Sequence, residues 1–438
     1  MNHYKETIRL GVPIMLGQLG IIIVGFADNI MVGHHSTQEL AAASFVNNFF
    51  NLAFIFGMGF SYGLTPIVGR LFAQKQYAEV GAMLKNSLAI NFIIGILLSL
   101  CMLFLLFNLD WLNQPKELYP YIIPYYILQL FSVVFTMLFN SFKQFSDGTT
   151  DTLTPMYVML SANVVNIIGN YFLIYGHGRF PELGLTGAGI STLFSRILTL
   201  AAFCWFFCRR KKYAEYVKGF KQSVINRESI RNLVRLGLPV GFQMGVETGS
   251  FSLSVIMMGW IGSTALAAYQ VGGVITTLGF MLYYGIGAAV SIRVSNFNGS
   301  RNNQEIRKAA QSGFVIINTC ALLFIAFLLL FCTRIGYLFT PEEEVVKLVA
   351  LFCWPMMLYQ FGDGLQILFA NALRGLTDVK YMAKMALVCH FGLALPIGYI
   401  CGFILNLGAL GVWFGFPISL TTLGLCLWRR FHVLTKAD

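Results

Sequence analysis

The chain has 438 residues, of which 57% are hydrophobic and 11% charged, and its formal net charge is +11. Soluble globular chains carry about 25% charged residues, so this composition excludes an ordinary soluble domain and indicates an integral membrane protein. The basic excess could by itself suggest a nucleic-acid partner, but the positions of the basic residues indicate otherwise.

Apolar stretches long enough to cross about 30 Å of hydrocarbon as helices recur along the whole chain. A membrane barrel would show short alternating segments instead, so we predict an all-α integral membrane protein with about twelve transmembrane helices. The first helix is expected to remain in the mature protein, because "MNHYKETIRLGVP" lacks the apolar core and cleavage site of a signal peptide. The expected spans lie near residues 8–33, 45–70, 86–109, 121–143, 155–176, 185–208, 235–260, 268–292, 311–333, 345–372, 383–405 and 409–428.

Lysine and arginine fall mostly on one side of these spans. Of the 30, we place 25 on the side of the N-terminus, and Arg196 lies inside a span. The remaining four are Lys116, Arg179, Arg334 and Lys347. Cytoplasmic loops carry such an excess, so we expect both termini in the cytoplasm and the protein in the cell (inner) membrane. Orientation and anionic headgroups then explain the charge; we expect a monomer in membrane lipid, with no nucleic-acid partner.

Short motifs recur at a fixed distance. "RLGVP" (9–13) returns as "RLGLP" (235–239), and "IMVG" (30–33) meets "IMMG" (256–259) at the same offset of 226 residues. Parallel repeats of this kind form transporters with a substrate site at the repeat interface. We therefore predict two pseudo-symmetric six-helix bundles around a central cavity. The expected ranges are 1–208 for the N-terminal bundle, 209–231 for a basic cytoplasmic linker with a short surface helix, and 232–438 for the C-terminal bundle.

Several function classes lack their motifs. The sequence has no G-x-x-x-x-G-K-[ST] loop for ATP, and neither HExxH nor GxSxG for a membrane-embedded enzyme. An ion gradient is the remaining energy source, at about 2.3 kcal/mol per charge per 100 mV. The nine cysteines show no zinc-site spacing, and we interpret them as small core hydrophobes. No cofactor is expected besides a coupling ion, Na⁺ or H⁺.

Three carboxylates lie deep inside apolar segments, namely Asp28, Glu247 and Asp363. An ionised Asp at a helix centre is disfavoured by about 2.5–3.5 kcal/mol on insertion scales, so such residues normally face a polar interior and have a function. Gln243 lies one turn before Glu247, and Gln366 lies on one helix face with Asp363.

The fifth span supplies a polar face that could serve Asp28, formed by Asn163, Asn166 and Asn170. The alternative interpretation is that these asparagines are hydrogen-bonded groups that only hold helices together. A carboxylate in a low-dielectric site favours its neutral form, and a nearby cation favours its ionised form. A coupling ion and a cationic substrate would therefore compete for the same charge.

Four segments in combination resemble the multidrug and toxic compound extrusion (MATE) family, close to its NorM branch. They are "GFADNIMVG" (25–33), "NIIGNYFLIYG" (166–176), "GVE" (245–247) and "YQFGDGLQ" (359–366). The resemblance extends over nearly the whole chain. It implies a secondary active multidrug exporter that exchanges Na⁺ or H⁺ for organic cations by alternating access between two bundles in a V-shaped pair.

The same resemblance implies which residues bind the coupling cation or proton and the substrate. They are Asp28, Asn166, Asn170, Glu247, Tyr359 and Asp363, with Pro13 as a secondary candidate. Gln243 and Gln366 are secondary candidates from their helical spacing beside Glu247 and Asp363. Na⁺ is one ion that Glu247, Tyr359 and Asp363 could hold. Some relatives bend at a proline matching Pro13. Asn170 stands where some relatives have a second acid, which leaves the ion of the first half open.

Other points also stay open at this level. A flippase for a lipid-linked saccharide shares a related architecture, but it would be expected to have a more cationic cavity than this sequence provides. The roles of Arg196 and His390, the choice between Na⁺ and H⁺, the stoichiometry and the identity of the drugs are not fixed by the residues.

Overall fold

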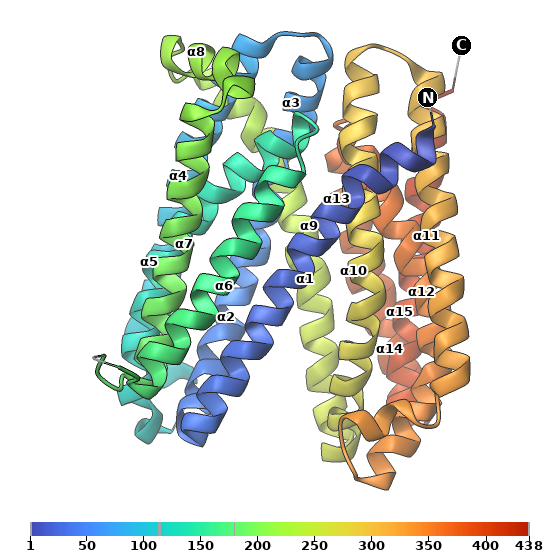
Figure 1. The fold of residues 1–438 in the computed structure, drawn as a ribbon. Helices are drawn as coiled ribbons and strands as arrows, with labels where there is room; N and C mark the ends of the chain where they lie inside the picture. The colour runs from blue at the N-terminus through green and yellow to red at the C-terminus, as the bar shows by residue number, and fades with distance from the viewer. Residues whose placement is uncertain (1, 113–114, 179, 437–438) are drawn as a thin grey trace. The chain divides into compact units, whose positions relative to one another are not determined.

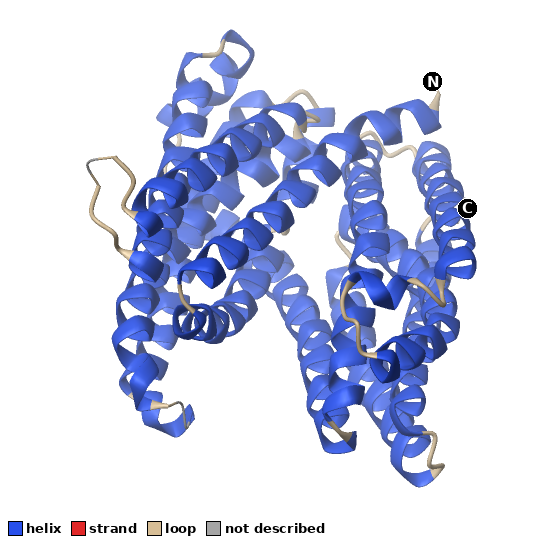
Figure 2. Cartoon of the chain, turned by 60° about the horizontal axis from the view of Figure 1, so that its bottom comes forward, coloured by secondary structure: helices blue, strands red, loops and turns tan. Residues whose placement is uncertain are grey.

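The computed structural model describes residues 2–112, 115–178 and 180–436. Within these ranges the chain forms helices joined by short loops and no strand (Figure 2). Eleven helices of the described part are long and apolar enough to cross a membrane. The predicted all-α, multi-pass membrane protein is therefore confirmed. Arg179, one of the basic residues assigned to a side above, lies outside the described residues.

The helices follow one another with few intervening residues (Figure 1). They are α1 (His3–His35), α2 (Thr37–Ser61), α3 (Leu64–Ala73), α4 (Tyr77–Phe107), α5 (Tyr119–Gly148), α6 (Leu153–Tyr175), α7 (Gly184–Arg209), α8 (Ala214–Gln222), α9 (Arg227–Ile261), α10 (Ser263–Gly299), α11 (Asn303–Phe331), α12 (Glu343–Gly375), α13 (Val379–Cys389), α14 (Leu395–Tyr399) and α15 (Gly408–Leu434). Two π-helical segments, His390–Ala394 and Ile400–Ile404, flank α14.

The seventh expected span, near 235–260, lies in α9. This helix has 35 residues, which at 1.5 Å per residue is ample for a bilayer. It is not among the eleven most apolar helices, because it carries Gln243, Glu247 and several serines in its central turns. Among the helices of 18 or more residues, the one too polar to belong to this set is thus one that carries a deep carboxylate.

The cysteines are all free thiols, but their positions correct part of the interpretation made above. Cys353 and Cys389 are buried, whereas Cys101 and Cys208 are exposed. The core interpretation is wrong for the exposed pair, because the outer face of a membrane helix is as apolar as its inner face.

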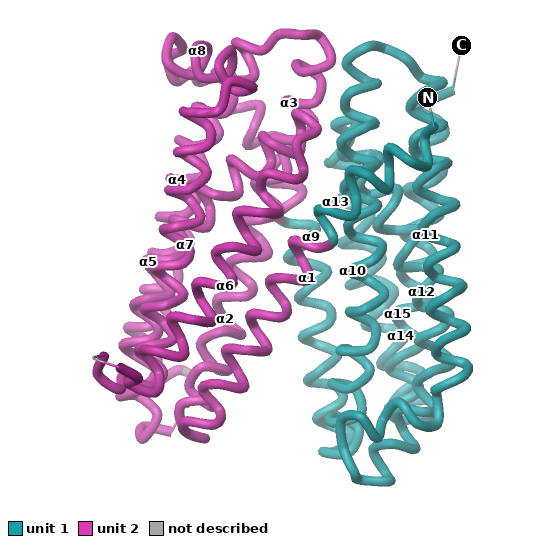
Figure 3. The backbone as a smooth tube through the Cα atoms, in the orientation of Figure 1, with its two compact units in different colours: residues 1–15, 242–438 teal, residues 16–241 magenta. Residues whose placement is uncertain are grey.

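The chain divides into two compact units (Figure 3). Residues 16–241, drawn in magenta as unit 2, are called the first unit in the text, and residues 1–15 with 242–438, drawn in teal as unit 1, are called the second unit. The division differs from the sequence ranges given above, since the linker and the first part of α9 group with the first unit. The first fifteen residues group with the second. Helices α1 and α9 therefore each contribute to both units.

Backbone geometry repeats between the halves. Lys75 and Arg301, 226 residues apart, have left-handed φ values of 59° and 56°. Thr150 and Thr377, 227 residues apart, have φ values of 63° and 66°. A non-glycine residue with positive φ is uncommon, so matching pairs of them at the repeat distance are strong evidence for duplication.

The ion pairs that follow these turns repeat as well. Lys212 Nζ lies 2.5 Å from Asp151 Oδ2, and Arg430 Nε lies 2.6 Å from Asp378 Oδ2. Burial opposes ionisation of Asp151, but hydrogen bonds from Lys212 and Tyr213 outweigh it, so the pKa of this carboxyl is lower than usual. In each half, the aspartate that follows a long helix, α5 or α12, thus pairs with a cation near the C-terminal end of the last long helix of that half, α7 or α15.

The linker contains the expected short helix, α8, and this helix packs on α4 through close backbone contact. A Cβ at Gly81 would lie 1.9 Å from the Tyr216 carbonyl oxygen, and one at Gly219 would lie 2.0 Å from that of Ala78. Lys85 Nζ also donates to the Ser223 carbonyl at 2.6 Å. The basic linker is therefore a fixed part of the first unit.

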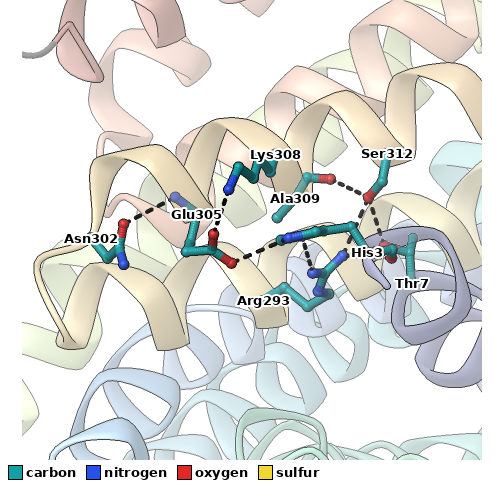
Figure 4. A network of polar contacts seen from close by, with 8 residues as sticks. All are labelled: His3, Thr7, Arg293, Asn302, Glu305, Lys308, Ala309 and Ser312. Atoms are coloured by element: carbon teal, nitrogen blue, oxygen red, sulfur yellow. Dashed lines mark hydrogen bonds and ion pairs between the residues drawn. The ribbon is translucent and has the colours of Figure 1, made fainter. Parts of the chain in front are cut away.

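In the second unit a polar network holds the start of α1 against α10 and α11 (Figure 4). The Arg293 guanidinium donates to the His3 carbonyl at 2.9 Å and to Thr7 Oγ1 at 2.6 Å. His3 Nε2 lies 3.2 Å from Glu305 Oε2, and Ser312 Oγ lies 2.9 Å from Thr7 Oγ1. Hydrogen bonds of a charged group are among the stronger ones, which explains why residues 1–15 belong to this unit.

The repeated "RLG[VL]P" motif places one glycine at each helix crossing. In the second unit, a Cβ at Gly285 would lie 2.7 Å from the Gly11 carbonyl oxygen. In the first unit, a Cβ at Gly237 would lie 2.3 Å from that of Phe60, and one at Gly63 would lie 2.6 Å from Gly237 N. Only glycine permits such an approach of backbones, so the motif recurs because it performs the same packing task twice.

This crossing can be tested with Gly237→Ala. The added methyl group meets backbone that cannot yield, so we expect a loss of about 1–3 kcal/mol in the free energy of unfolding, measured as a lower Tm in detergent. Gly245→Ala is the matched control, because no described atom lies within 4 Å of its Cβ position. It should gain up to about 1 kcal/mol from helix propensity. Equal Tm values for the two variants would contradict the close crossing.

Candidate ion and substrate sites

The three deep carboxylates differ from other buried acids in having no fixed cation. Within the described residues, Asp28, Glu247 and Asp363 form no ion pair with a lysine, arginine or histidine. Asp147 and Glu39 are two further acids that are buried, and they lie at helix ends, in the last turn of α5 and the first turn of α2. Asp147, however, is paired with Lys143 at 3.0 Å, and Glu39 with His35 at 2.8 Å.

In the first unit, Asp28 on α1 is held by two amides of α6. Asn170 Nδ2 donates to Asp28 Oδ1 at 2.5 Å. The Asn166 amide, oriented so that both its groups find partners, donates to the same oxygen at 3.1 Å and accepts from Thr192 N at 3.2 Å. Asn166 and Asn170 lie four residues apart on one helix face. The structure thus brings together the three predicted residues of this half.

Arg196 on α7 lies close enough to Asp28 for an electrostatic interaction but forms no ion pair with it. Its guanidinium donates to Gln129 Oε1 at 3.3 Å and to Ser132 Oγ, and it stacks 4.4 Å above the Phe54 ring. Polar groups of α5 and an aromatic face therefore hold the charge of Arg196. The Asp28 carboxylate is left with neutral donors only.

In the second unit, Glu247 on α9 has the corresponding arrangement with glutamines. Gln243 Nε2 donates to Glu247 Oε2 at 3.3 Å, and Gln366 Nε2 on α12 donates to Oε1 at 3.1 Å. Both glutamines are buried. The secondary candidates Gln243 and Gln366 thus contact the carboxylate directly.

Asp363 and Tyr359 lie on α12 and are both buried. Asp363 interacts electrostatically with Glu247, and Tyr359 with both acids. The Tyr359 ring meets Trp413 edge-on at 6.4 Å between centroids. The predicted trio of the second half therefore forms one electrostatically coupled group, with an aromatic wall beside it.

Several buried oxygen atoms of this group have no donor. They are Asp363 Oδ2, Gln243 Oε1 and Gln366 Oε1. Buried polar atoms without partners are rare in proteins, and oxygen atoms of carboxylates and amides are the ligands that hard cations prefer. The described residues contain no cluster of three His, Cys, Asp or Glu side chains that could hold a metal ion. Na⁺ binding here would therefore depend on amide and phenol oxygens as well as on the two acids.

Three further residues singled out from the sequence are placed as follows. Pro13 lies inside α1, which continues as one helix through it, two residues before the division between the units. Asn163 Nδ2 is buried without a partner, and no hydrogen bond joins it to Asp28. His390 is buried in a π-helical segment with Nδ1 3.3 Å from Ser250 Oγ.

Sequence reasoning missed some residues around Asp28. Thr192 orients the Asn166 amide through its backbone N–H, and Gln129 and Ser132 hold Arg196. These residues lie on α5 and α7, so no spacing within one helix could connect them with Asp28. The i, i+4 spacing of Lys143 and Asp147 was visible and could have indicated their ion pair.

The hydrogen bonds of Asp28 can be separated from its charge. Asp28→Leu leaves two amides without an acceptor, at about 1–3 kcal/mol each, whereas Asp28→Asn keeps an acceptor oxygen. We expect a clearly lower Tm for the leucine variant and a near wild-type Tm for the asparagine variant.

Asn163→Leu is the matched control, because the Asn163 nitrogen has no partner to lose. It should unfold at or above the wild-type temperature. If Asp28→Leu were as stable as this control, the hydrogen bonds from Asn166 and Asn170 to Asp28 would not contribute to the stability of the folded protein.

The sequence was compared with known families and structures. The MatE family model matches residues 13–172 and 239–400. The multidrug resistance protein NorM of Vibrio cholerae serotype O1 is 28% identical over all of this chain and 97% of its own. The probable multidrug resistance protein NorM of Xylella fastidiosa (strain Temecula1) is 27% identical over 99% of this chain and 93% of its own.

A solved structure also matches the whole chain. The crystal structure of the eukaryotic MATE transporter AtDTX14 superposes with a TM-score of 0.88 and 18% sequence identity, covering all of this chain and 96% of that one. At this identity the likeness shows the fold. The duplicated helical architecture and the matched ranges agree, since each matched range contains one of the two carboxylate groups.

Proposed function

Because the chain belongs to the MatE family, we propose that it is a secondary active multidrug exporter that exchanges a cation for organic cations by alternating access. The relatives compared above are transporters, not enzymes, and two are called multidrug resistance proteins. Their names support drugs as the substrate class. The proposed location is the inner cell membrane, with both termini in the cytoplasm and the chain acting as a monomer.

The observation that carries this proposal is a carboxylate in each unit that is hydrogen-bonded by amides and unpaired with a cation. Asp28 has donors from Asn170 and Asn166, and Glu247 from Gln243 and Gln366. In a low-dielectric site an unpaired negative charge attracts a mobile cation far more strongly than in water. A coupling ion and an organic cation then compete for it, and this competition produces antiport.

The two units offer different chemistry to the coupling ion. Around Asp28 the amides of Asn166 and Asn170 present N–H groups, and of their two oxygens Asn170 Oδ1 is buried without a donor; the N–H groups suit a carboxylate that gains and loses a proton. Around Glu247 and Asp363 there are buried oxygen atoms without donors, which suit either a proton or Na⁺. We propose that coupling involves Glu247, Asp363 and Tyr359, with Asp28 as the site of the first unit.

Removing the charge of these acids should abolish export. We expect Asp28→Asn, Glu247→Gln and Asp363→Asn each to reduce efflux of a fluorescent organic cation about tenfold or more, equivalent to about 1.4 kcal/mol of lost cation binding. The assay uses cells that lack their own pumps.

Glu343→Gln is the control for the same chemical change on an exposed residue, since Glu343 is 73% exposed beside Lys347. Efflux should match wild type, at equal amounts of protein in the membrane. The proposal fails if all three deep variants transport as well as this control.

The coupling ion is identified in vesicles containing the purified protein. An imposed Na⁺ gradient with the pH gradient collapsed should drive accumulation of the organic cation if Na⁺ couples. An imposed pH gradient without Na⁺ should drive it if H⁺ couples. Asp363→Asn should remove either response, and movement that ignores both gradients would contradict antiport.

A further inference from the structure

A cavity of about 310 Å³ lies between α6 and α7, on the first unit and apart from the residues that bind Asp28. Its walls include Val158, Val165, Leu198 and Phe206, and Arg210 lies at the end where α7 stops. The two helices pack side by side along their length. The cavity is thus a mostly apolar groove between two membrane-spanning helices, with one cation at its end.

The groove opens on a surface that a bilayer would cover. Both α6 and α7 are among the helices apolar enough to span a membrane. At the rim, Tyr157 is 62% and Leu198 37% exposed. Exposed apolar side chains on a spanning helix are solvated by lipid chains. A hydrocarbon chain can therefore reach the groove without crossing water.

The end of the groove holds an ordered group of cations. The Arg210 guanidinium stacks 4.3 Å above the Phe206 ring, and one of its nitrogens donates to Thr154 Oγ1 at 3.1 Å. Lys212 Nζ lies 3.2 Å from the same hydroxyl. Thr154 thus holds two cations together, one of them fixed over the aromatic wall of the groove.

The charge at this end is unbalanced. The run at 209–212 is Arg-Arg-Lys-Lys. Asp151 pairs with Lys212, but within the described residues no carboxylate forms an ion pair with Arg210. The excess lies at the C-terminal end of α7, and the ends of a spanning helix lie near the lipid headgroups.

We propose that the α6–α7 groove is a binding site for an anionic phospholipid, with an acyl chain between the helices and the phosphate at Arg210 and Lys212. Basic pockets between transmembrane helices recognise anionic headgroups in this way, and a guanidinium can bind phosphate through two parallel hydrogen bonds. A zwitterionic lipid offers the same chain, but its ammonium group is repelled by the excess of cations. The headgroup therefore gives the selectivity and the groove gives the affinity.

The test uses native mass spectrometry of the full chain, purified in detergent and freed of lipid. Phosphatidylglycerol, phosphatidylcholine and glycerol 3-phosphate are added separately. We expect phosphatidylglycerol to remain bound at concentrations where the other two do not. Arg210→Gln should weaken phosphatidylglycerol binding about fivefold, the effect of one basic residue near a headgroup.

Two variants separate the site from general surface charge. Lys221→Gln removes the same charge from an exposed position on α8 and should leave binding unchanged. Ser161→Trp adds a ring at the exposed rim of the groove and should weaken phosphatidylglycerol binding while every cation remains. Ala202→Trp fills the groove from α7 and provides a second test of the same point. Each variant is first shown to unfold at the wild-type temperature.

Three results would overturn the proposal. Equal retention of phosphatidylcholine would show that the cations do not select the headgroup. An equal effect of Arg210→Gln and Lys221→Gln would show diffuse charge in place of a site. Binding of glycerol 3-phosphate as tight as that of the lipid, or binding unchanged by both tryptophan variants, would show that the groove takes no chain.

Discussion

The exchange that we propose depends on hydrogen bonds between side-chain amides and carboxylates that have no fixed cation. A buried carboxylate without partners would be costly to keep in a membrane. A lysine or arginine beside it would remove that cost but would also occupy the negative charge. Amides satisfy the oxygen atoms and leave the charge available. Asn170 and Asn166 do this for Asp28, and Gln243 and Gln366 do it for Glu247.

The contrast with the other buried acids supports this interpretation. Asp147 is paired with Lys143 and Glu39 with His35, and such pairs stabilise a fixed arrangement of helix ends. Asp151 and Asp378 likewise hold cations near the ends of α7 and α15. The chain therefore uses paired acids to fasten helices, and the acids without a fixed cation are those at which we propose that an ion and a substrate exchange.

Duplication preserved the packing of the two halves more closely than their chemistry. The glycine of each "RLG[VL]P" motif still makes a backbone crossing, with Gly11 against Gly285 and Gly237 against Phe60 and Gly63. The sites have diverged, because the amides are asparagines of α6 in one unit and glutamines of α9 and α12 in the other. A buried tyrosine interacts electrostatically with the acid in each unit, Tyr125 with Asp28 and Tyr359 with Glu247, but the second unit adds a buried aspartate, Asp363 on α12. This difference is consistent with unequal tasks for the two units in coupling.

The sequence by itself determined the helical membrane fold, the duplication and the choice of Asp28, Glu247 and Asp363. These features follow from local composition and spacing, because an apolar run, a repeated motif and an isolated charge are each visible within one segment. The tertiary structure decided which donors meet these acids, since Asn170, Thr192 and Gln366 come from other helices than their partners. It also decided that residues 1–15 group with the second unit and that the linker groups with the first. Arg293 and the glycine crossings make those contacts across long sequence distances, and no local pattern encodes them.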